Sequence, residues 1–283
     1  MRFDDMSANQ FGDDFYRRIS ALIYDRTGLS FNESSRFFLE KRLETRISSL
    51  GMTMPEDYIS FLMFDGDSER EWDALITLIT TNETYFMREE RQLKCFREDI
   101  LPELARKNPG KKIRVWSAGC SSGEEPYSIA ILARECRHVT DQMIEIFATD
   151  INSRVIQRAK DGIYGDSSFR AVDEAFKLRW FVPEGQQKWK LKEEIRKKVT
   201  FQRFNLFDMD RYSIFAPFDV IFCRNVIIYF DLEAKVRVVE RFYDKLAEGG
   251  YLLLGHSESL ISVTEKFRLV HLANDLVYRK EIR

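Results

Sequence analysis

The stretch IRVWSAGCSSGEEP, residues 113–126, decides the fold of this chain. It opens with an apolar run of strand-forming residues, Ile113 to Trp116. Small residues follow as far as Gly123, and then come two glutamates, Pro126 and an apolar pattern of helical period. Acidic residues and a proline suit the first turn of a helix, because the helix dipole favours negative charge there and the first N–H groups need no helical partner. The stretch therefore predicts a strand, a tight turn and a helix.

The glycine turn after the strand predicts the floor of a nucleotide-type pocket. Gly119 and Gly123 lack a Cβ, so a ligand can approach the backbone closely. Their spacing is not that of the G-x-G-x-x-G motif, which disfavours a dehydrogenase. The adjacent Glu124 and Glu125 would repel a pyrophosphate but would suit hydroxyls or positive charge. A nucleoside that carries a sulfonium or ammonium group, such as S-adenosylmethionine, fits these features.

Length, charge and cysteine usage narrow the class of protein. The 283 residues allow a sizeable core and about two domains, and the net charge of −2 favours neither nucleic acid nor an acidic membrane. The four cysteines are scattered, with no C-x-x-C pair, so neither a metal site nor a disulfide framework is expected. The first residues lack an apolar signal core and no run is long enough to span a membrane. We therefore expect a cytoplasmic protein without membrane insertion.

Residues 1–80 are predicted to form a helical domain, because apolar residues recur at helical spacing between short breaks. Gly28 and Gly51 end the first two helices, and Pro55 opens a third. This segment has 9 Lys and Arg against 15 Asp and Glu, yet its second helix is basic. The basic side chains of that helix are Arg36, Lys41, Arg42 and Arg46. They form either a solvated helix face or a docking surface for an acidic partner.

The junction after this domain, residues 80–88, is dense in hydroxyl, amide and aromatic side chains. It is either a polar linker with aromatic plugs or a contributor to a site between domains. Arg88 stands out, since a guanidinium can hold a carboxylate in a bidentate manner.

From residue 96 onward strands and helices alternate, which predicts a mostly parallel sheet with helices around it. The expected strands are 113–117, 144–149, 199–202, 218–223 and 251–255, followed by an antiparallel pair near Val270 and 276–278. Asp150 ends the second strand, where it is placed either to accept ribose hydroxyls or to cap the next helix.

Residues 163–200 interrupt the alternation and predict a small antiparallel insertion. Its hairpin has a turn at 183–185, and its second strand alternates apolar and basic residues. This hairpin is either solvated or a partner-binding flap.

The motifs taken together resemble those of one family. TTNETYFMRE, RVWSAGCSSGEEPYSIA, FATDIN, FCRNVIIYF and GGYLLLGHSESL occur in this order along nearly the whole chain. They are similar to the motifs of the chemotaxis receptor glutamate O-methyltransferase family, CheR. The resemblance implies an all-α helical domain over 1–80, a linker over 81–95 that contributes to the site, and a Rossmann-like S-adenosylmethionine-dependent methyltransferase domain over 96–283. This α/β domain would have a mostly parallel sheet with an antiparallel last strand and a β-subdomain inserted at about 163–200.

The resemblance also implies roles for individual residues. Arg88 and Tyr229 match the residues nearest the transferred methyl group, and the four basic residues of the second helix would dock on the receptor. The matches to the cofactor-binding residues are Asn82, Thr84, Arg88, Gly119, Glu125, Asp150, Asn205, Leu206, Arg224 and Asn225.

The reaction implied by the resemblance is methyl transfer from S-adenosylmethionine to glutamate carboxylates of chemoreceptor cytoplasmic helices. The products would be S-adenosylhomocysteine and glutamate methyl esters that serve sensory adaptation. A glutamate is already ionised at neutral pH, so transfer needs alignment and exclusion of water rather than a general base. We expect a monomer recruited to receptor arrays. The short hairpin turn of the insertion argues against tethering by a carboxyl-terminal receptor peptide.

The sequence leaves two alternatives to this function open. One is a methyltransferase acting on nucleic acid or small molecules. Amino-methylating DNA enzymes carry an N/D-P-P-Y/F motif where this chain reads R-N-V-I-I-Y, and the net charge is wrong for a DNA binder, so no nucleic-acid partner is expected. The other is a non-catalytic adaptor that binds receptor and cofactor without transfer.

Overall fold

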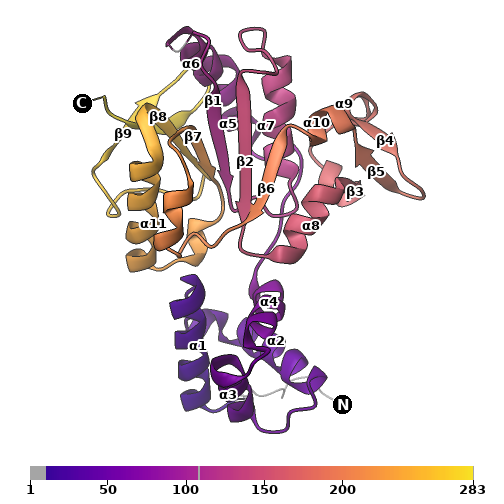
Figure 1. Ribbon diagram of the computed structural model, residues 1–283, viewed down its shortest axis with the longest axis vertical. Coiled ribbons are helices and arrows are strands. Elements are labelled where there is room, and N and C mark those ends of the chain that lie inside the picture. Colours follow the sequence, from indigo (N-terminus) through magenta and orange to yellow (C-terminus); the bar gives the residue numbers. More distant parts are fainter. Residues whose placement is uncertain (1–10, 108, 283) are drawn as a thin grey trace, which may run out of the picture. The chain divides into compact units, whose positions relative to one another are not determined.

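The computed structural model describes residues 11–107 and 109–282, which fall into two compact units (Figure 1). The first unit contains the described residues up to Thr81 together with the short segment Tyr229–Asp231. The second contains Asn82–Ile228 and the chain from Leu232 onward. No helix in the described ranges is long and apolar enough to cross a membrane.

The first unit is helical, as the spacing of its apolar residues predicts. Its helices are α1 (Asp13–Thr27), α2 (Arg36–Ser49), α3 (Pro55–Phe64) and α4 (Ser68–Ile79). Their apolar faces form one core that includes Ile19, Leu39, Leu43, Tyr58 and Leu75. Gly28 ends α1 in the left-handed region with φ 74°, a conformation that glycine adopts without cost.

The segment Tyr229–Asp231 is held in this first unit by contacts with the residues that follow α1. Leu29 and Phe230 form an antiparallel bridge. The Ser30 N–H donates to the Tyr229 carbonyl at 3.1 Å. Two stretches that are distant in the sequence are therefore joined through their backbones.

The second unit contains a sheet of seven strands in the order β6-β2-β1-β7-β8-β10-β9. Strands β6, β2, β1, β7 and β8 pair in parallel, and β10 pairs antiparallel with both β8 and β9. This confirms the mostly parallel sheet with its antiparallel end. The bounds of the strands are β1 (Ile113–Ala118), β2 (Ile144–Asp150), β6 (Val199–Arg203), β7 (Phe218–Cys223), β8 (Leu246–Leu254), β9 (Phe267–His271) and β10 (Leu276–Lys280).

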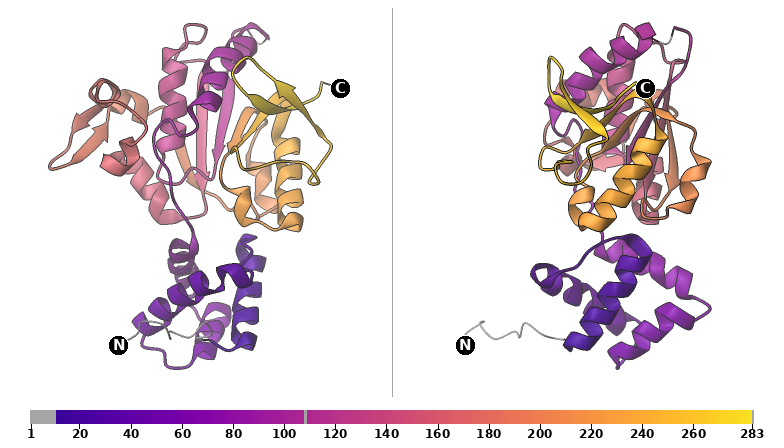
Figure 2. Two further views of the ribbon diagram at one scale, coloured as in Figure 1. Left: turned by 180° about the vertical axis from the view of Figure 1, so that it is seen from behind. Right: turned by 90° about the vertical axis from the view of Figure 1, so that its left-hand side faces the viewer.

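Helices surround this sheet (Figure 2). They are α5 (Glu90–Cys95), a π-helical turn (Phe96–Ile100), α6 (Leu101–Lys107), α7 (Glu124–Glu135), α8 (Ser153–Asp161) and α11 (Leu232–Lys245). One predicted boundary is wrong, because β8 begins at Leu246 and not at residue 251. Gly249 and Gly250 lie inside that strand, and Gly250 sits so close to the Asp219 carbonyl that a Cβ would approach it to 3.0 Å.

The inserted β-subdomain lies beyond β6, beside the main sheet (Figure 1). Its strands pair antiparallel in the order β3 (Ile163–Gly165), β5 (Lys188–Leu191) and β4 (Phe181–Pro183). Two short helices complete it, α9 (Glu174–Trp180) and α10 (Glu193–Arg196). The hairpin is present as expected, and β3 is a third strand that the sequence pattern did not indicate.

Phe86 anchors the linker to this subdomain. Its side chain is fully buried, and its ring centroid lies 4.8 Å from Tyr164, 5.0 Å from Phe181 and 5.4 Å from Phe169. The Phe86 N–H donates to the Ser168 carbonyl at 2.9 Å. Tertiary packing therefore fixes the linker that precedes α5.

Candidate active site

The predicted cofactor residues of the second unit gather at the carboxyl ends of the parallel strands. The N–H groups of Gly119 and Cys120, after β1, both donate to the carbonyl of Thr149 in β2 at 2.8 Å. The Phe204 N–H, just after β6, donates to the Asp150 carbonyl at 2.9 Å. Because these strands run in parallel, the loops that follow them meet at one edge of the sheet, where ligands bind in such folds.

The two glycines of the turn after β1 are required by packing as well as by backbone conformation. Gly119 has φ 84°, and a Cβ there would lie 2.4 Å from Cγ2 of Val226. Gly123 has φ 93°, and a Cβ would lie 2.8 Å from the Cβ of Ala159. The loop after β7 and helix α8 thus press directly on the turn that the sequence assigns to a ligand.

Asp150 is fixed by backbone donors from two directions. Its Oδ2 accepts from the Ser121 N–H at 2.8 Å, and its Oδ1 accepts from the Asn152 N–H at 2.9 Å. Burial raises the pKa of Asp150, although these backbone donors act in the opposite direction. The side chain that caps α8 is Asn152. Each oxygen of Asp150 has a second lone pair that a hydroxyl of a ribose could use.

Ser121 connects the linker to this acid. While its N–H bonds Asp150, its hydroxyl donates to the Asn82 carbonyl at 3.2 Å. Asn82, the glycine turn and Asp150 therefore form one connected group.

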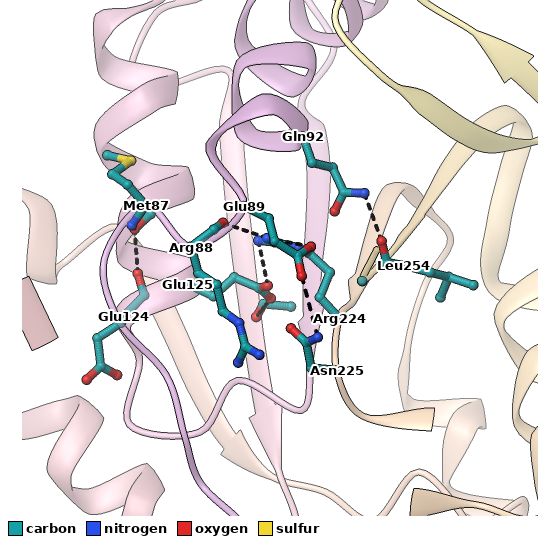
Figure 3. Close-up of polar contacts among 12 residues, drawn as sticks. Met87, Arg88, Glu89, Gln92, Glu124, Glu125, Arg224, Asn225 and Leu254 are labelled. Carbon is teal, nitrogen blue, oxygen red and sulfur yellow. Dashed lines mark hydrogen bonds and ion pairs between the residues drawn. The ribbon is translucent and has the colours of Figure 1, made fainter. Parts of the chain in front are cut away.

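A buried ion cluster forms the other part of the site (Figure 3). The Arg224 side chain is 2% exposed and lies 3.2 Å from Oε2 of Glu125 and 3.1 Å from Oε2 of Glu89. It also donates to the Arg88 carbonyl. Oε1 of Glu125 accepts from the Ser117 hydroxyl at 2.7 Å. The cluster thus connects β1, α7, the loop after β7 and the linker.

The two glutamates of the cluster differ in their protonation tendencies. Burial favours the neutral acid at Glu89, but Arg224, with smaller contributions from His256 and Asn225, outweighs that effect and the pKa of Glu89 is lowered. At Glu125 burial dominates over the attraction of Arg224, and its pKa is raised. Nε of Arg224 is buried and has no hydrogen-bond partner among the described residues. One donor of this buried guanidinium is therefore left unsatisfied by the described part of the chain, which is unusual in protein interiors.

Strained backbone accompanies these contacts. Left-handed φ values occur at Met87 (59°), Glu89 (52°), Ser121 (48°) and Asn225 (59°). Non-glycine residues adopt this region rarely and gather where surrounding structure overdetermines them, commonly at functional sites. Nδ2 of Asn225 lies 3.5 Å from Oε1 of Glu89, so the cluster continues into the loop after β7.

The remaining cofactor candidates lie in the same unit. Arg88 is half-buried, and its guanidinium donates to the Glu83 carbonyl at 2.9 Å. Thr84 is also half-buried, in the linker. Asn205 accepts the Phe207 N–H on its Oδ1 at 3.0 Å. Leu206 is buried next to it in the chain, and its carbonyl accepts from the Tyr212 hydroxyl at 2.8 Å.

Tyr229 belongs to the first unit. Its side chain is 38% exposed, and its carbonyl holds Ser30 as described above. Its role at the transferred methyl group stays a prediction.

Most of the basic side chains of α2 have partners inside the first unit. Arg36 pairs with Glu40 at 2.8 Å, and Arg46 forms two hydrogen bonds to the buried Glu71. Nε of Arg42 donates to a backbone carbonyl at 2.8 Å. Within the described ranges, Lys41 is exposed and makes no ion pair. The docking role of these four residues stays a prediction, and Lys41 is the side chain most available for it.

Two acids of the site are not among the residues predicted from the sequence. Glu89 holds Arg224, and Glu258 bonds the backbone of the loop after β7. Both lie inside the quoted motifs TTNETYFMRE and GGYLLLGHSESL. Their presence within these motifs is the one feature of the sequence that could have indicated them. The partner of Glu89 is Arg224, more than a hundred residues further along the chain, so the sequence pattern does not reveal this pair.

The donor set fits S-adenosylmethionine. Asp150 suits ribose hydroxyls, and the carboxylates of Glu89 and Glu125 suit a positively charged group beside them. In the described part of the chain, no group of three or more His, Cys, Asp or Glu side chains is arranged to hold a metal ion.

The fold and this site define an S-adenosylmethionine-dependent methyltransferase. A family model for the CheR methyltransferase S-adenosylmethionine-binding domain matches residues 82–275, and the model for its all-alpha domain matches residues 14–80. The chain therefore belongs to the CheR methyltransferase family.

Relatives of known name agree with this membership. The chain is 37% identical to chemotaxis protein methyltransferase 2 of Vibrio cholerae, over 93% of this chain and 91% of the relative. It is 34% identical to the chemotaxis protein methyltransferase of Borreliella burgdorferi, over 86% of this chain and 87% of the relative.

Proposed function

We propose that this protein transfers a methyl group from S-adenosylmethionine to glutamate side chains of chemoreceptors, forming methyl esters for sensory adaptation. The observation that carries the proposal is the similarity to chemotaxis protein methyltransferases, which spans 93% of the chain for the Vibrio cholerae relative. The site chemistry supports it, because acids and one buried arginine surround a glycine turn at the edge of the sheet.

The reaction requires little of the protein beyond positioning the substrate carboxylate and the methyl donor. A lone pair of the substrate carboxylate forms the new O–C bond while the C–S bond breaks and its electrons remain on sulfur. The carboxylate is ionised at neutral pH, so no side chain has to remove a proton. The acceleration of methyl transfer would come from the alignment of oxygen, carbon and sulfur and from the exclusion of water.

The residues of this chain divide these tasks in our proposal. Asp150 receives the ribose hydroxyls, and Glu125 with Arg224 holds the charged end of the cofactor. Arg88 steers the substrate carboxylate, because the residue is half-buried and, among the described residues, its side chain makes one hydrogen bond, to a backbone carbonyl. Tyr229 shapes the methyl site.

Receptor docking is assigned to α2. Its residue Lys41 is exposed beside Phe37, a phenylalanine whose side chain is 68% exposed on the preceding turn. An acidic receptor helix would complement Lys41. We infer that the protein acts in the cytoplasm as a monomer recruited to receptor arrays. The turn between β4 and β5, in which the Glu184 N–H bonds the Lys188 carbonyl at 2.8 Å, leaves no long loop for a receptor tail peptide.

The test is transfer of labelled methyl from S-adenosylmethionine to membranes that carry chemoreceptors, followed by mild alkali. Label that enters the receptor and is released as methanol supports a carboxyl methyl ester. Cofactor binding without transfer to any receptor would contradict the proposal in favour of a non-catalytic adaptor, and label that resists alkali would indicate another substrate group.

Arg88→Ala tests the steering role. We expect loss of most transfer, by about a hundredfold or more, with an unchanged melting temperature. Arg106→Ala is the matched control, because Arg106 is exposed and its Nε also donates to a nearby backbone carbonyl. Equal turnover of the two variants would refute the role of Arg88.

Lys41→Glu tests docking without breaking an internal ion pair. We expect weaker receptor binding and unchanged affinity for S-adenosylhomocysteine. Undiminished receptor binding would exclude Lys41 from the docking surface.

A further inference from the structure

Glu258 is half-buried between two loops and accepts hydrogen bonds from four backbone N–H groups. Its Oε2 accepts from Asn225 at 2.6 Å and from Gly255 at 2.7 Å. Its Oε1 accepts from Val226 at 3.0 Å and from Ile228 at 3.3 Å. Three of these donors belong to the loop after β7, and the fourth follows β8. One carboxylate thus joins the ends of two neighbouring strands.

The loops are in close contact around this carboxylate. A Cβ on Gly255 would lie 2.8 Å from both Nδ2 of Asn225 and Oε2 of Glu258. The Glu258 N–H closes the turn by donating to the Gly255 carbonyl at 2.8 Å. A side chain at position 255 would therefore collide with both Asn225 and Glu258, and the two loops can approach this closely because residue 255 is glycine.

The clamped loop carries groups of the candidate site. Asn225 has φ 59°, a strained value that needs external support. Its Nδ2 lies 3.5 Å from Glu89, and Arg224 precedes it. Val226 packs so tightly on the glycine turn that a Cβ on Gly119 would lie 2.4 Å from it. A shift of the loop would therefore move both the ion cluster and the floor of the site.

A carboxylate is the side chain suited to this task. The N–H groups of Asn225, Val226 and Ile228 lie beyond the end of β7 and bond Glu258 in place of a neighbouring strand. A charged acceptor with two oxygens can satisfy several such donors at once. A glutamine offers one acceptor oxygen and would place an NH₂ group against the other donors.

We propose that Glu258 is a positioning residue for the cofactor site, holding residues 224–228 against the glycine turn. The proposal rests on the assignment of Arg224 and Asn225 to cofactor binding. Glu258 acts through this loop and is not itself given contact with the cofactor.

The experiment measures binding of S-adenosylhomocysteine to the full chain by calorimetry. Glu258→Gln should raise the dissociation constant by about tenfold or more. The Michaelis constant for S-adenosylmethionine should rise in parallel, while turnover at saturating cofactor changes less. Glu240→Gln is the control, because Glu240 pairs with Lys266 at the surface with 48% of its side chain exposed. This control should bind as the wild type does.

A lower melting temperature with an unchanged dissociation constant would overturn the proposal, since it would show a structural role alone. If Glu258→Gln does not fold, Glu258→Asp replaces it. That variant keeps the charge but is too short to reach both loops, and wild-type affinity in a folded Glu258→Asp protein would likewise overturn the proposal. Because the calorimetric measurement of S-adenosylhomocysteine binding needs no receptor, failure of receptor methylation in the wild type would refute the proposed function and leave this binding test intact.

Discussion

Arg224→Met provides a quantitative test of the ion cluster. The substitution keeps an unbranched apolar stem but removes a cation whose side chain is 2% exposed. Glu89 and Glu125, with side chains 15% and 14% exposed, then lose their common partner.

The distances set the size of the effect. At 3.1 and 3.2 Å each pair attracts by about 5 kcal/mol when the effective dielectric constant is about 20. Part of this attraction offsets the cost of burying the charges, and breaking a buried pair typically costs about 3–5 kcal/mol. We therefore expect the free energy of unfolding of the second unit to fall by about 3–5 kcal/mol.

Urea unfolding followed by tryptophan fluorescence measures this change. A Trp72→Phe background removes the one tryptophan of the first unit, so that the emission reports on the second unit. Arg241→Met is the control, because Arg241 pairs with Asp244 at 3.4 Å on the surface with 43% of its side chain exposed. Such exposed pairs contribute about 0–1 kcal/mol.

A second substitution tests the cause. If uncompensated carboxylates destabilise Arg224→Met, adding Glu125→Gln should recover part of the loss, with a coupling of about 1–3 kcal/mol. Because Arg224 lowers the pKa of Glu89 despite its burial, the difference from wild type should also shrink as the pH falls below about 4.5, where carboxyls of the unfolded chain become protonated. A loss under about 1 kcal/mol, or a double variant with purely additive losses, would refute the reasoning.

Two further predictions concern buried side chains near the linker. Burial raises the pKa of Glu124, although the hydroxyls of Ser122 and Ser168 oppose the effect, so the contribution of Glu124 to stability falls as the pH rises above about 4.5. In thermal unfolding, the stability of Glu124→Gln relative to wild type should therefore increase from about pH 5 to pH 8. A difference that does not change with pH would contradict this. Phe86→Ala should lower the free energy of unfolding by about 3–5 kcal/mol, because the ring is fully buried among aromatic side chains. As a control, Phe37→Ala at an exposed position should change the free energy of unfolding by no more than about 0.5 kcal/mol. Similar losses at both positions would show that Phe86 does not anchor the linker.

The sequence predicted those strands well whose pattern depends on neighbouring residues alone. The strand 218–223 coincides with β7, because a continuous apolar run between polar residues is typical of a strand buried on both faces. The boundary of β8 was wrong, because two glycines normally indicate a helix end. Here Gly250 is required inside the strand by the approach of the Asp219 carbonyl.

The basic helix shows a different limit. Four cations on α2 suggest a free positive surface, yet the structure pairs Arg36 and Arg46 with acids within the unit. The partner of Arg46 is Glu71, which lies 25 residues further along the chain and is buried. Charge counts along a helix do not reveal which charges are already paired in the tertiary structure.

The sequence by itself determined the helical first unit, the parallel sheet and the glycine turn, together with the family motifs that point to the cofactor residues. These features follow from periodicity, turn chemistry and residue order, which are properties of neighbouring residues. Only the tertiary structure decided that Arg224 joins Glu89 to Glu125 and that Glu258 clamps the loop after β7. Parallel strands bring their carboxyl ends to one edge whatever their distance along the chain, so the charges that meet there are set by topology.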